Sequence, residues 1–532
     1  MHDSTEGGVA TGLYELASAS DVGLEIAGDA LPTATATQRL CSEYGLDPPG
    51  VISSGALLIG CTANATAAIL SALRAANIAA THIGSVRETS FGMQLRRGDQ
   101  CVPLPIFPRT KSLVSSPDIL QRPRLRYLAS PLPNPYFLPL HVQRTSSPMP
   151  LQTQFTFQHT TSVVHGPNST ALLPEYLPDK NKILLVTDKG LVAAGVAARV
   201  CEVLNDANIP HILYDGALAN PPARCVHAGA RLYEREKCKA IVGLGGGSPM
   251  DVAKMIGVLA SHSGRIDQYL GIGKVTKNMP PLVCIPTTYG TASEVTPFAV
   301  LTNPKTQNKD PVISPKIAPQ VGILDPELSV ALPAFVGGPT GMDALTHALE
   351  SYTNLLATPI SDGLALHAIR LIGDNLRLAC ANNHELAATE NMLIASMLAG
   401  MAFSQTRLGN VHAMSHPVGA QFGVHHGLAN AILLPYVMEF NLTARLSKFA
   451  VVAEVLGADI AGLDEREAAQ TAIDAIWRLN QDLNIPTKLG DVGVKKSGIR
   501  PMAKAAMLSG NITVNPRKTS QNDLETIFKQ AI

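Results

Sequence analysis

The chain has 532 residues, of which 46% are hydrophobic and 16% are charged, so it can form large buried cores and lacks the composition of a disordered protein. Its 42 basic and 42 acidic residues cancel, which argues against a nucleic-acid-binding protein, because such proteins usually carry excess positive charge. The eight cysteines include no C-x-x-C pair, and no unbroken apolar run approaches the roughly 18 residues of a membrane span. The first residues, MHDSTEGGVATG, have neither the basic nor the apolar region of a secretory signal. We therefore expect a cytoplasmic homo-oligomer with free thiols that binds neither nucleic acid nor membrane.

The first part of the chain is expected to form a separate α/β domain over residues 1–108. It mixes alanine-rich helical patterns with one predicted strand in the run GVISSGALLIG (Gly50–Gly60). Residues 109–151 are predicted to be an extended, semi-rigid linker, because 11 of the 38 prolines lie between Pro103 and Pro150 and proline has no amide hydrogen to donate in a helix or a central strand. A polyproline ligand for a partner protein is the alternative interpretation of this segment.

From Gln152 onward, buried strands alternate with amphipathic helices. Strands are predicted in KILLVTD (Lys182–Asp188), HILYDG (His211–Gly216), AIVGLGGG (Ala240–Gly247), LVCIPTT and VGILDP. Apolar strands that alternate with helices indicate a mostly parallel sheet covered on both faces, here over residues 152–328. After Leu328 only helical patterns remain, so residues 329–532 are predicted to be all-helical.

A glycine-rich turn joins the strand AIVGLGGG to a helix that begins within GSPMDVAKMIG. Glycines at such a turn let a phosphate approach backbone amides, and the helix N-terminus adds about half a positive charge there. Ser248 is expected to cap the helix, and Pro249 suits a first-turn position that needs no amide donor. Glycine also occurs in many strand-to-helix turns for conformational reasons alone, so the turn by itself does not establish a coenzyme site.

Polar residues at two other strand ends strengthen the coenzyme interpretation. Asp188 ends the first strand of the unit, where a carboxylate meets the adenosine ribose in dinucleotide sites; a simple helix-capping or solvated aspartate is the alternative. The turn PTTYGTASE follows another strand and carries Thr287, Thr288 and Thr291. Because the carboxyl ends of parallel strands meet at one edge of a sheet, we expect these hydroxyls to converge on the glycine-rich turn.

The histidines cluster at one place in the helical half. The run GNVHAMSHPVGAQFGVHHG contains His412, His416, His425 and His426. Upstream, GMDALTHALESY places Asp343 and His347 four residues apart, as are His412 and His416, so each pair shares one face of a helix. A carboxylate with several imidazoles is a ligand set suited to Fe(II) or Zn(II) rather than to a metal that prefers thiolates. The spacing predicts a metal centre but does not decide which histidines bind the ion.

These motifs resemble those of the iron-containing (group III) alcohol dehydrogenases. The resemblance runs from about Gln152 to Ile532 through LVTDKGL, YDGALANP, GLGGGSPMDVAK, IPTTYGTASEVT, TGMDALTHALESY, GNVHAMSHPVGA and HHGLANAILLPYVMEFN, in the order and spacing of that family. It implies a metal-dependent oxidoreductase that transfers a hydride between NAD(H) and a small primary alcohol or aldehyde. The implied cofactors are NAD and Fe(II), with Zn(II) as the alternative metal.

The resemblance also assigns roles to individual residues. It implies that the metal ligands are Asp343, His347, His412 and His426. It places His416 near the nicotinamide and the substrate, where it would relay a proton. His425 is the alternative to His426, and the spacing from His416 favours His426. The implied coenzyme-contacting positions are Asp188, Asn220, Gly246, Gly247, Ser248, Asp251, Thr287, Thr288, Thr291, Thr296 and Lys309.

The stretches GLYELASASDVGLEIAGDALP, GLDPPGVISSGALLIG and LRRGDQCVPLP, between about Val9 and Pro108, resemble a different family, the C-terminal domain of AIR-synthase-related (hydrogenase-maturation-like) proteins. The ATP-handling half that precedes this domain in that family is not found here, so we expect a docking or vestigial domain without ATPase activity. Two other functions remain as alternatives for the whole chain. One is a dehydroquinate-synthase-like lyase that uses NAD and a metal, and the other is a non-catalytic scaffold or maturation factor.

Overall fold

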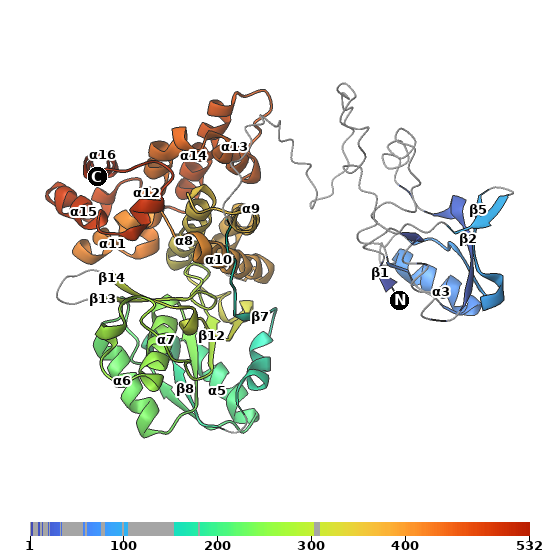
Figure 1. The fold of residues 1–532 in the computed structure, drawn as a ribbon, viewed down its shortest axis with the longest axis horizontal. Coiled ribbons are helices and arrows are strands. Elements are labelled where there is room, and N and C mark those ends of the chain that lie inside the picture. The colour runs from blue at the N-terminus through green and yellow to red at the C-terminus, as the bar shows by residue number, and fades with distance from the viewer. Residues whose placement is uncertain are drawn as a thin grey trace. The chain divides into compact units, whose positions relative to one another are not determined.

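The computed structural model describes residues 154–178, 181–302, 309–382 and 384–532, and shorter stretches of the N-terminal region (Figure 1). Those stretches are residues 2–3, 9–10, 13, 17, 20, 22–31, 33, 57–58, 61–75, 80–97 and 100–104. The chain divides into two compact units, Met1–Arg144 and Thr145–Ile532. The predicted linker 109–151 lies outside the described residues.

The N-terminal unit contains a four-stranded sheet with the order β4–β2–β5–β6. Its strands are β2 (Gly23–Ala27), β4 (Gly84–Arg87), β5 (Met93–Arg97) and β6 (Gln100–Pro103). The central strand β2 pairs parallel with β5 and antiparallel with β4. Leu24, Ile26 and Leu95 alternate along β2 and β5 and form the core with Leu104. This arrangement, with helix α3 (Ala63–Ala75), confirms the predicted α/β class.

Only part of the strand predicted in Gly50–Gly60 can be compared with the structure. Leu57–Leu58 form β3, which pairs antiparallel with β1 (His2–Asp3). The other residues of that predicted strand lie outside the described part of the chain.

The second unit begins with a six-stranded parallel sheet with the order β7–β15–β12–β10–β8–β9. The strands are β7 (Ser162–His165), β8 (Ile183–Val186), β9 (His211–Tyr214), β10 (Ala240–Gly245), β12 (Leu282–Pro286) and β15 (Val321–Leu324). Five of them were predicted from the sequence, and β7 was not. Both faces of the sheet are covered: along β8, Leu184 and Val186 join one apolar core, whereas Ile183 and Leu185 join the other.

Helices on the two faces complete these cores. Helix α5 (Val196–Asp206) packs into the core that contains Ile183. Helices α6 (Ala223–Arg235) and α7 (Gly247–Ser261) pack into the opposite core (Figure 1). A second, three-stranded sheet was not predicted. It contains β11 (Gly271–Ile272), β13 (Phe298–Thr302) and β14 (Lys309–Ile313), with β13 and β14 antiparallel.

The rest of the second unit is helical, as the sequence predicted. The helices are α8 (Ala334–Thr353), α9 (Pro359–Ala381), α10 (Leu386–Thr406), α11 (Asn410–Phe422), α12 (His426–Asn441), α13 (Leu446–Val455), α14 (Glu465–Asp482), α15 (Ile499–Ala506) and α16 (Gln521–Ala531). They share one apolar core, and α8 is buried along almost its whole length, from Gly337 to Thr353. Within the described residues, α10 alone is long and apolar enough to cross a membrane by length and composition. Its buried residues, such as Ala395 and Ala399, belong to this core.

Local sequence signals determine where several of these helices begin. At the start of α9, Thr358 Oγ1 accepts a hydrogen bond from the amide of Ser361, and the Thr358 amide donates one to Ser361 Oγ. Asp464 and Glu467 form the same reciprocal pair at the start of α14. Such capping boxes satisfy amides that have no partner within the helix. They therefore fix the first turns of α9 and α14.

Candidate metal centre and coenzyme loop

Three helices bring the predicted metal ligands together. Asp343 and His347 lie one turn apart on α8, while His412 is on α11 and His426 is the first residue of α12. The Asp343 Oδ1 atom is 3.9 Å from His347 Nε2, 3.5 Å from His412 Nε2 and 3.8 Å from His426 Nε2. Asp343, His347 and His412 are buried, while His426 is partly exposed. One carboxylate and three imidazole nitrogens therefore surround one point.

These separations fit a first-row divalent cation. Ligand atoms about 2.1 Å from a tetrahedral ion lie about 3.4 Å from one another, close to the distances from Asp343. The atoms of Asp343, His347 and His412 all lie within 4.8 Å of one another. A nitrogen and oxygen ligand set of this kind suits Fe(II) or Zn(II). The chemistry and geometry of the donor set therefore fit the predicted ion.

The structure distinguishes between the two adjacent histidines. His425 precedes α12 as its N-cap residue, and its side chain is exposed. His426 directs Nε2 toward Asp343. His416 lies beside the ligands: its ring centre is 5.3 Å from that of His426 and 6.3 Å from that of His412. The cluster thus brings together His412, His416 and His426, with His416 as a neighbour of the ligand group.

Two further contacts orient the imidazole rings. His412 Nδ1 is 2.6 Å from Glu350 Oε2, and Glu350 Oε1 accepts a hydrogen bond of 2.6 Å from the Val411 amide. His347 Nδ1 is 3.1 Å from the Gly290 carbonyl oxygen. A hydrogen bond at Nδ1 leaves Nε2 to face the cation and makes the ring a better ligand. Glu350 was not predicted from the sequence, although it lies seven residues after Asp343 and therefore on the same face of α8.

Burial and mutual charge set the protonation of this cluster. Burial favours the neutral form of Asp343, but the three neighbouring histidines outweigh it and hold the pKa of Asp343 well below its usual range. Burial lowers the pKa of His347 to about 4, so its imidazole is neutral at neutral pH. Burial opposes protonation of His412, but hydrogen bonds to Asp343 and Glu350 raise its pKa to about 9. A cation at His412 Nε2 therefore competes with a proton.

The glycine-rich turn lies between β10 and α7. Gly245 has φ of +142°, a conformation that side chains rarely allow. Gly246 is the N-cap of α7, and its helical residues begin at Gly247. The prediction that Ser248 caps the helix was wrong, because Ser248 lies one residue inside it. With no side-chain cap, the first-turn amides of α7 are suited to an anionic group.

The turn after β12 meets this loop, as its position at the same sheet edge predicted. A Cβ atom added to Gly247 would lie 2.9 Å from Thr291 Cγ2, and one added to Gly246 would lie 3.4 Å from Thr288 Oγ1. Thr287 is buried, and its amide donates to the Gly245 carbonyl oxygen over 3.0 Å. The two turns thus form one polar surface at the carboxyl edge of the sheet.

Two predicted coenzyme residues tie α7 to β13 and to the segment before it. The Asp251 carboxylate accepts hydrogen bonds from Ser293 Oγ (2.7 Å) and from the Val300 amide (2.9 Å). Thr296 is buried, and its carbonyl oxygen accepts a 2.9 Å bond from Lys254 Nζ, which is itself fully buried. These contacts hold the coenzyme loop in place, so they give Asp251 and Thr296 a structural role within the protein.

The other predicted coenzyme positions lie apart from the loop in sequence. Asp188 follows β8 and caps the short helix α4 (Lys189–Ala193), where Oδ1 accepts a 3.0 Å bond from the Leu191 amide. Asn220 is exposed in the loop after β9 and has a left-handed φ of 51°. Lys309 begins β14, and its side chain lies outside the described part of the structure.

Beside the loop, Glu294 is a buried acid whose ionisation is expected to affect stability. Burial raises its pKa to about 7 from an ordinary 4.5, although its own amide and Lys254 oppose the shift. The folded state then holds a proton that the unfolded state releases, so the free energy of unfolding falls as pH rises from about 4.5 to about 7. Because a difference of one pKa unit corresponds to about 1.4 kcal/mol, the free energy of unfolding should fall by about 3 kcal/mol over this pH range. Urea unfolding at pH 5 and pH 8 should show this decrease, and Glu294→Gln should reduce it. An equal decrease in the variant would contradict the assignment.

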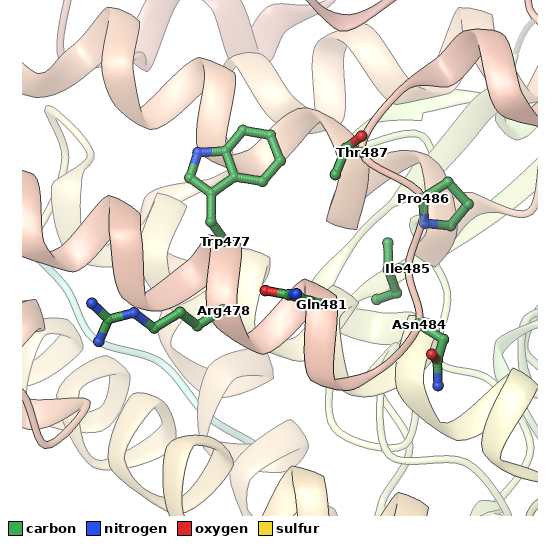
Figure 2. Close-up of a pocket in the computed structure, with 7 residues that line it drawn as sticks. All are labelled: Trp477, Arg478, Gln481, Asn484, Ile485, Pro486 and Thr487. Carbon is green, nitrogen blue, oxygen red and sulfur yellow. The ribbon is translucent and has the colours of Figure 1, made fainter.

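A separate hollow on the surface of the helical half contains no part of this site. It is lined by Trp477, Arg478, Gln481, Asn484, Ile485, Pro486 and Thr487, from α14 and the loop that follows (Figure 2). None of the predicted ligands or coenzyme residues is among them. The predicted ligands and coenzyme residues therefore lie outside this hollow.

Comparison with known proteins agrees with this geometry. Residues 160–326 match the family model described as iron-containing alcohol dehydrogenase, and residues 339–532 match the C-terminal model of the Fe-containing alcohol dehydrogenase family. Residues 1–95 match the C-terminal domain of AIR synthase related proteins, as the sequence indicated.

Individual relatives give the same result. The chain is 46% identical to 1,3-propanediol dehydrogenase of Klebsiella pneumoniae over 69% of its own length and 96% of the relative. It is 40% identical to NAD-dependent methanol dehydrogenase of Bacillus methanolicus, over 66% and 92% of the two chains. A crystal structure of 1,3-propanediol oxidoreductase matches 71% of this chain and all of its own, with a TM-score of 0.70 and 44% identity. The chain therefore belongs to the iron-containing alcohol dehydrogenase family and is a metal-dependent alcohol oxidoreductase.

Proposed function

We propose that the enzyme transfers a hydride between NAD(H) and a small primary alcohol or aldehyde, at a centre held by Asp343, His347, His412 and His426. The convergence of these four side chains from three helices is the observation that carries the proposal. Fe(II) is the proposed metal and Zn(II) the alternative, because both accept this ligand set.

The protein supplies the positions and the proton chemistry of the reaction. When bound, the cation is a Lewis acid toward an alcohol or carbonyl oxygen, and the nicotinamide carries the hydride. Glu350 and Gly290 keep His412 and His347 aligned, and the ionised Asp343 balances positive charge. His416, beside His412 and His426 but outside the ligand group, is placed to take the alcohol proton on a ring nitrogen.

The first substrate to test is 1,3-propanediol, the compound in the name of the Klebsiella relative. A panel should compare it with methanol, ethanol, 1-propanol and the secondary alcohol 2-propanol, together with the corresponding aldehydes and ketone. Turnover would be followed at 340 nm with Fe(II)-loaded protein. Steady oxidation of one or more primary alcohols is expected, and activity confined to secondary alcohols would contradict the proposed substrate class.

NAD is expected to be preferred over NADP. Asp188 ends β8 and opens α4, and in this position a carboxylate accepts hydrogen bonds from a ribose and repels a 2′-phosphate. Asp188→Gly should therefore narrow the ratio of kcat/KM for NAD to that for NADP, because it removes the repulsion. A wild-type enzyme that prefers NADP, or a variant with an unchanged ratio, would contradict the role of Asp188.

We propose that catalysis resides in residues 152–328, which bind the coenzyme, and residues 329–532, which bind the metal. Residues 1–108 form the additional domain and residues 109–151 the linker. All proposed ligands and coenzyme contacts lie in the second compact unit. A chain that begins near Leu151 should therefore fold, bind metal and NAD, and keep most of its oxidation rate, and residues 1–108 alone should not hydrolyse ATP. A truncated enzyme that binds metal but is inactive would place the N-terminal unit in the active assembly.

The remaining proposals concern the cellular context. A neutral chain with these relatives is proposed to be a cytoplasmic homo-oligomer, with an alcohol or aldehyde as its small-molecule partner and no nucleic-acid or membrane partner. Light scattering of the purified protein tests the oligomer directly. A monomer at micromolar concentration would contradict it.

A further inference from the structure

One side chain outside the predicted set lies against the ligand atoms. Asn430 is on α12, one turn after His426, and is completely buried. Its Nδ2 atom donates to Asp343 Oδ1 over 2.6 Å and lies 3.1 Å from His412 Nε2 and 3.3 Å from His426 Nε2. A single amide nitrogen therefore touches three of the four atoms proposed to bind the cation.

The other end of the Asn430 amide has no partner. Its Oδ1 atom is buried without a hydrogen bond, and an unpaired buried acceptor is unfavourable because it has lost its hydrogen bonds to water. The nitrogen and oxygen of a carboxamide exchange places by rotation about the terminal side-chain torsion, which has a broad energy profile. The oxygen can bind a cation, whereas the nitrogen lone pair is delocalised into the amide.

The two states of the centre favour opposite orientations of this amide. Without a cation, the lone pairs of Asp343 Oδ1 attract an N–H group, which is the orientation observed. With a cation, those lone pairs are engaged and an N–H group would face positive charge. We propose that Asn430 is a fifth metal-facing side chain, whose N–H closes the ligand group in the absence of the cation and whose Oδ1 faces the cation when it is bound. This inference rests on the proposed metal centre.

Cobalt(II) substitution of the full-length protein tests the proposal, because four-coordinate Co(II) absorbs visible light more strongly than five-coordinate Co(II). Asn430→Leu keeps the size of the side chain, leaves little room for water and removes the oxygen. Its Co(II) absorption should be stronger than that of the wild type, and its Co(II) affinity should fall by about tenfold or more. Asn430→Asp keeps an oxygen in place, so its spectrum should match the wild type.

A matched control is available on α14. Asn480 is also buried, donates through Nδ2 to the Ala431 carbonyl oxygen over 2.8 Å, and has an unpartnered Oδ1. Asn480→Leu therefore measures the general effect of replacing a buried asparagine next to α12, and it should leave the Co(II) spectrum unchanged.

The possible outcomes distinguish the role proposed for Asn430 from the proposal that the metal centre exists. A wild type that binds no Co(II) would overturn both proposals. A wild type that binds Co(II) and shares its spectrum and affinity with Asn430→Leu would overturn only the role of Asn430. If Asn430→Leu fails to fold, Asn430→Asp still decides: absorption weaker than that of the wild type would mean that the carboxylate adds a ligand that Asn430 does not supply.

Discussion

Replacing His412 with alanine should remove most of the bound metal and nearly all turnover. His412 Nε2 is 3.5 Å from Asp343 Oδ1, and its Nδ1 atom is 2.6 Å from Glu350 Oε2. The contact at Nδ1 fixes the ring so that Nε2 faces the other proposed ligands. The variant leaves three side chains around the ion and removes the imidazole partner of the buried Glu350. His426→Ala should have the same effect, because its Nε2 completes the group. Elemental analysis of purified protein, with kcat measured on the same samples, checks both results.

His416→Ala is the control for these variants. Its ring lies beside those of His412 and His426 without belonging to the ligand group. It should retain the metal and lose about 10²–10⁴-fold in rate, the range typical of a lost acid–base group. Full metal content in both His412→Ala and His426→Ala would show that the ligands have been misassigned.

Placing a side chain at Gly247 should greatly weaken coenzyme binding and leave the metal in place. A Cβ atom there would lie 2.9 Å from Thr291 Cγ2, closer than real side-chain contacts allow. Gly247→Val would therefore push apart the loop and the turn that we propose to face the phosphates. The loss of two charge-assisted hydrogen bonds at about 1.5 kcal/mol each corresponds to a rise in the Kd for NADH on the order of a hundredfold. Fluorescence titration with NADH gives that Kd.

Gly363→Val provides the matched comparison. Gly363 is an exposed residue within α9, and an added Cβ would meet nothing within 4 Å. This variant should bind NADH like the wild type. If Gly247→Val also bound NADH normally, the phosphates would have to lie elsewhere than at the start of α7.

The main sheet was predictable because its strands are short, apolar on both faces and bounded by glycine, proline or aspartate. The strand β7 was missed because only four residues, SVVH, pair at the edge of the sheet, and they are partly exposed. The three-stranded sheet was missed for a different reason. It pairs Gly271–Ile272 with residues about 40 positions later, and such pairing depends on tertiary contacts rather than on a local pattern.

The parts of the site that follow from local sequence patterns were predictable, and the parts that depend on helix packing were not. Asp343 and His347 share a helix face by spacing alone, so their proximity follows from the sequence. Glu350 and Asn430 were missed because their role depends on how α8, α11 and α12 pack together. The Ser248 cap was predicted wrongly because α7 begins at Gly247, directly after a glycine that leaves no side chain at the N-cap.

The most direct test of the central claim is metal-dependent reduction of NAD, followed at 340 nm with 1,3-propanediol and the full-length protein. After removal of metal by a chelator, the rate should fall to background, and adding Fe(II) under reducing conditions should restore it. Zn(II) as the only restoring ion would change the metal and leave the site intact. An NAD reduction rate that is unchanged by metal removal would contradict the proposal that Asp343, His347, His412 and His426 hold a catalytic cation.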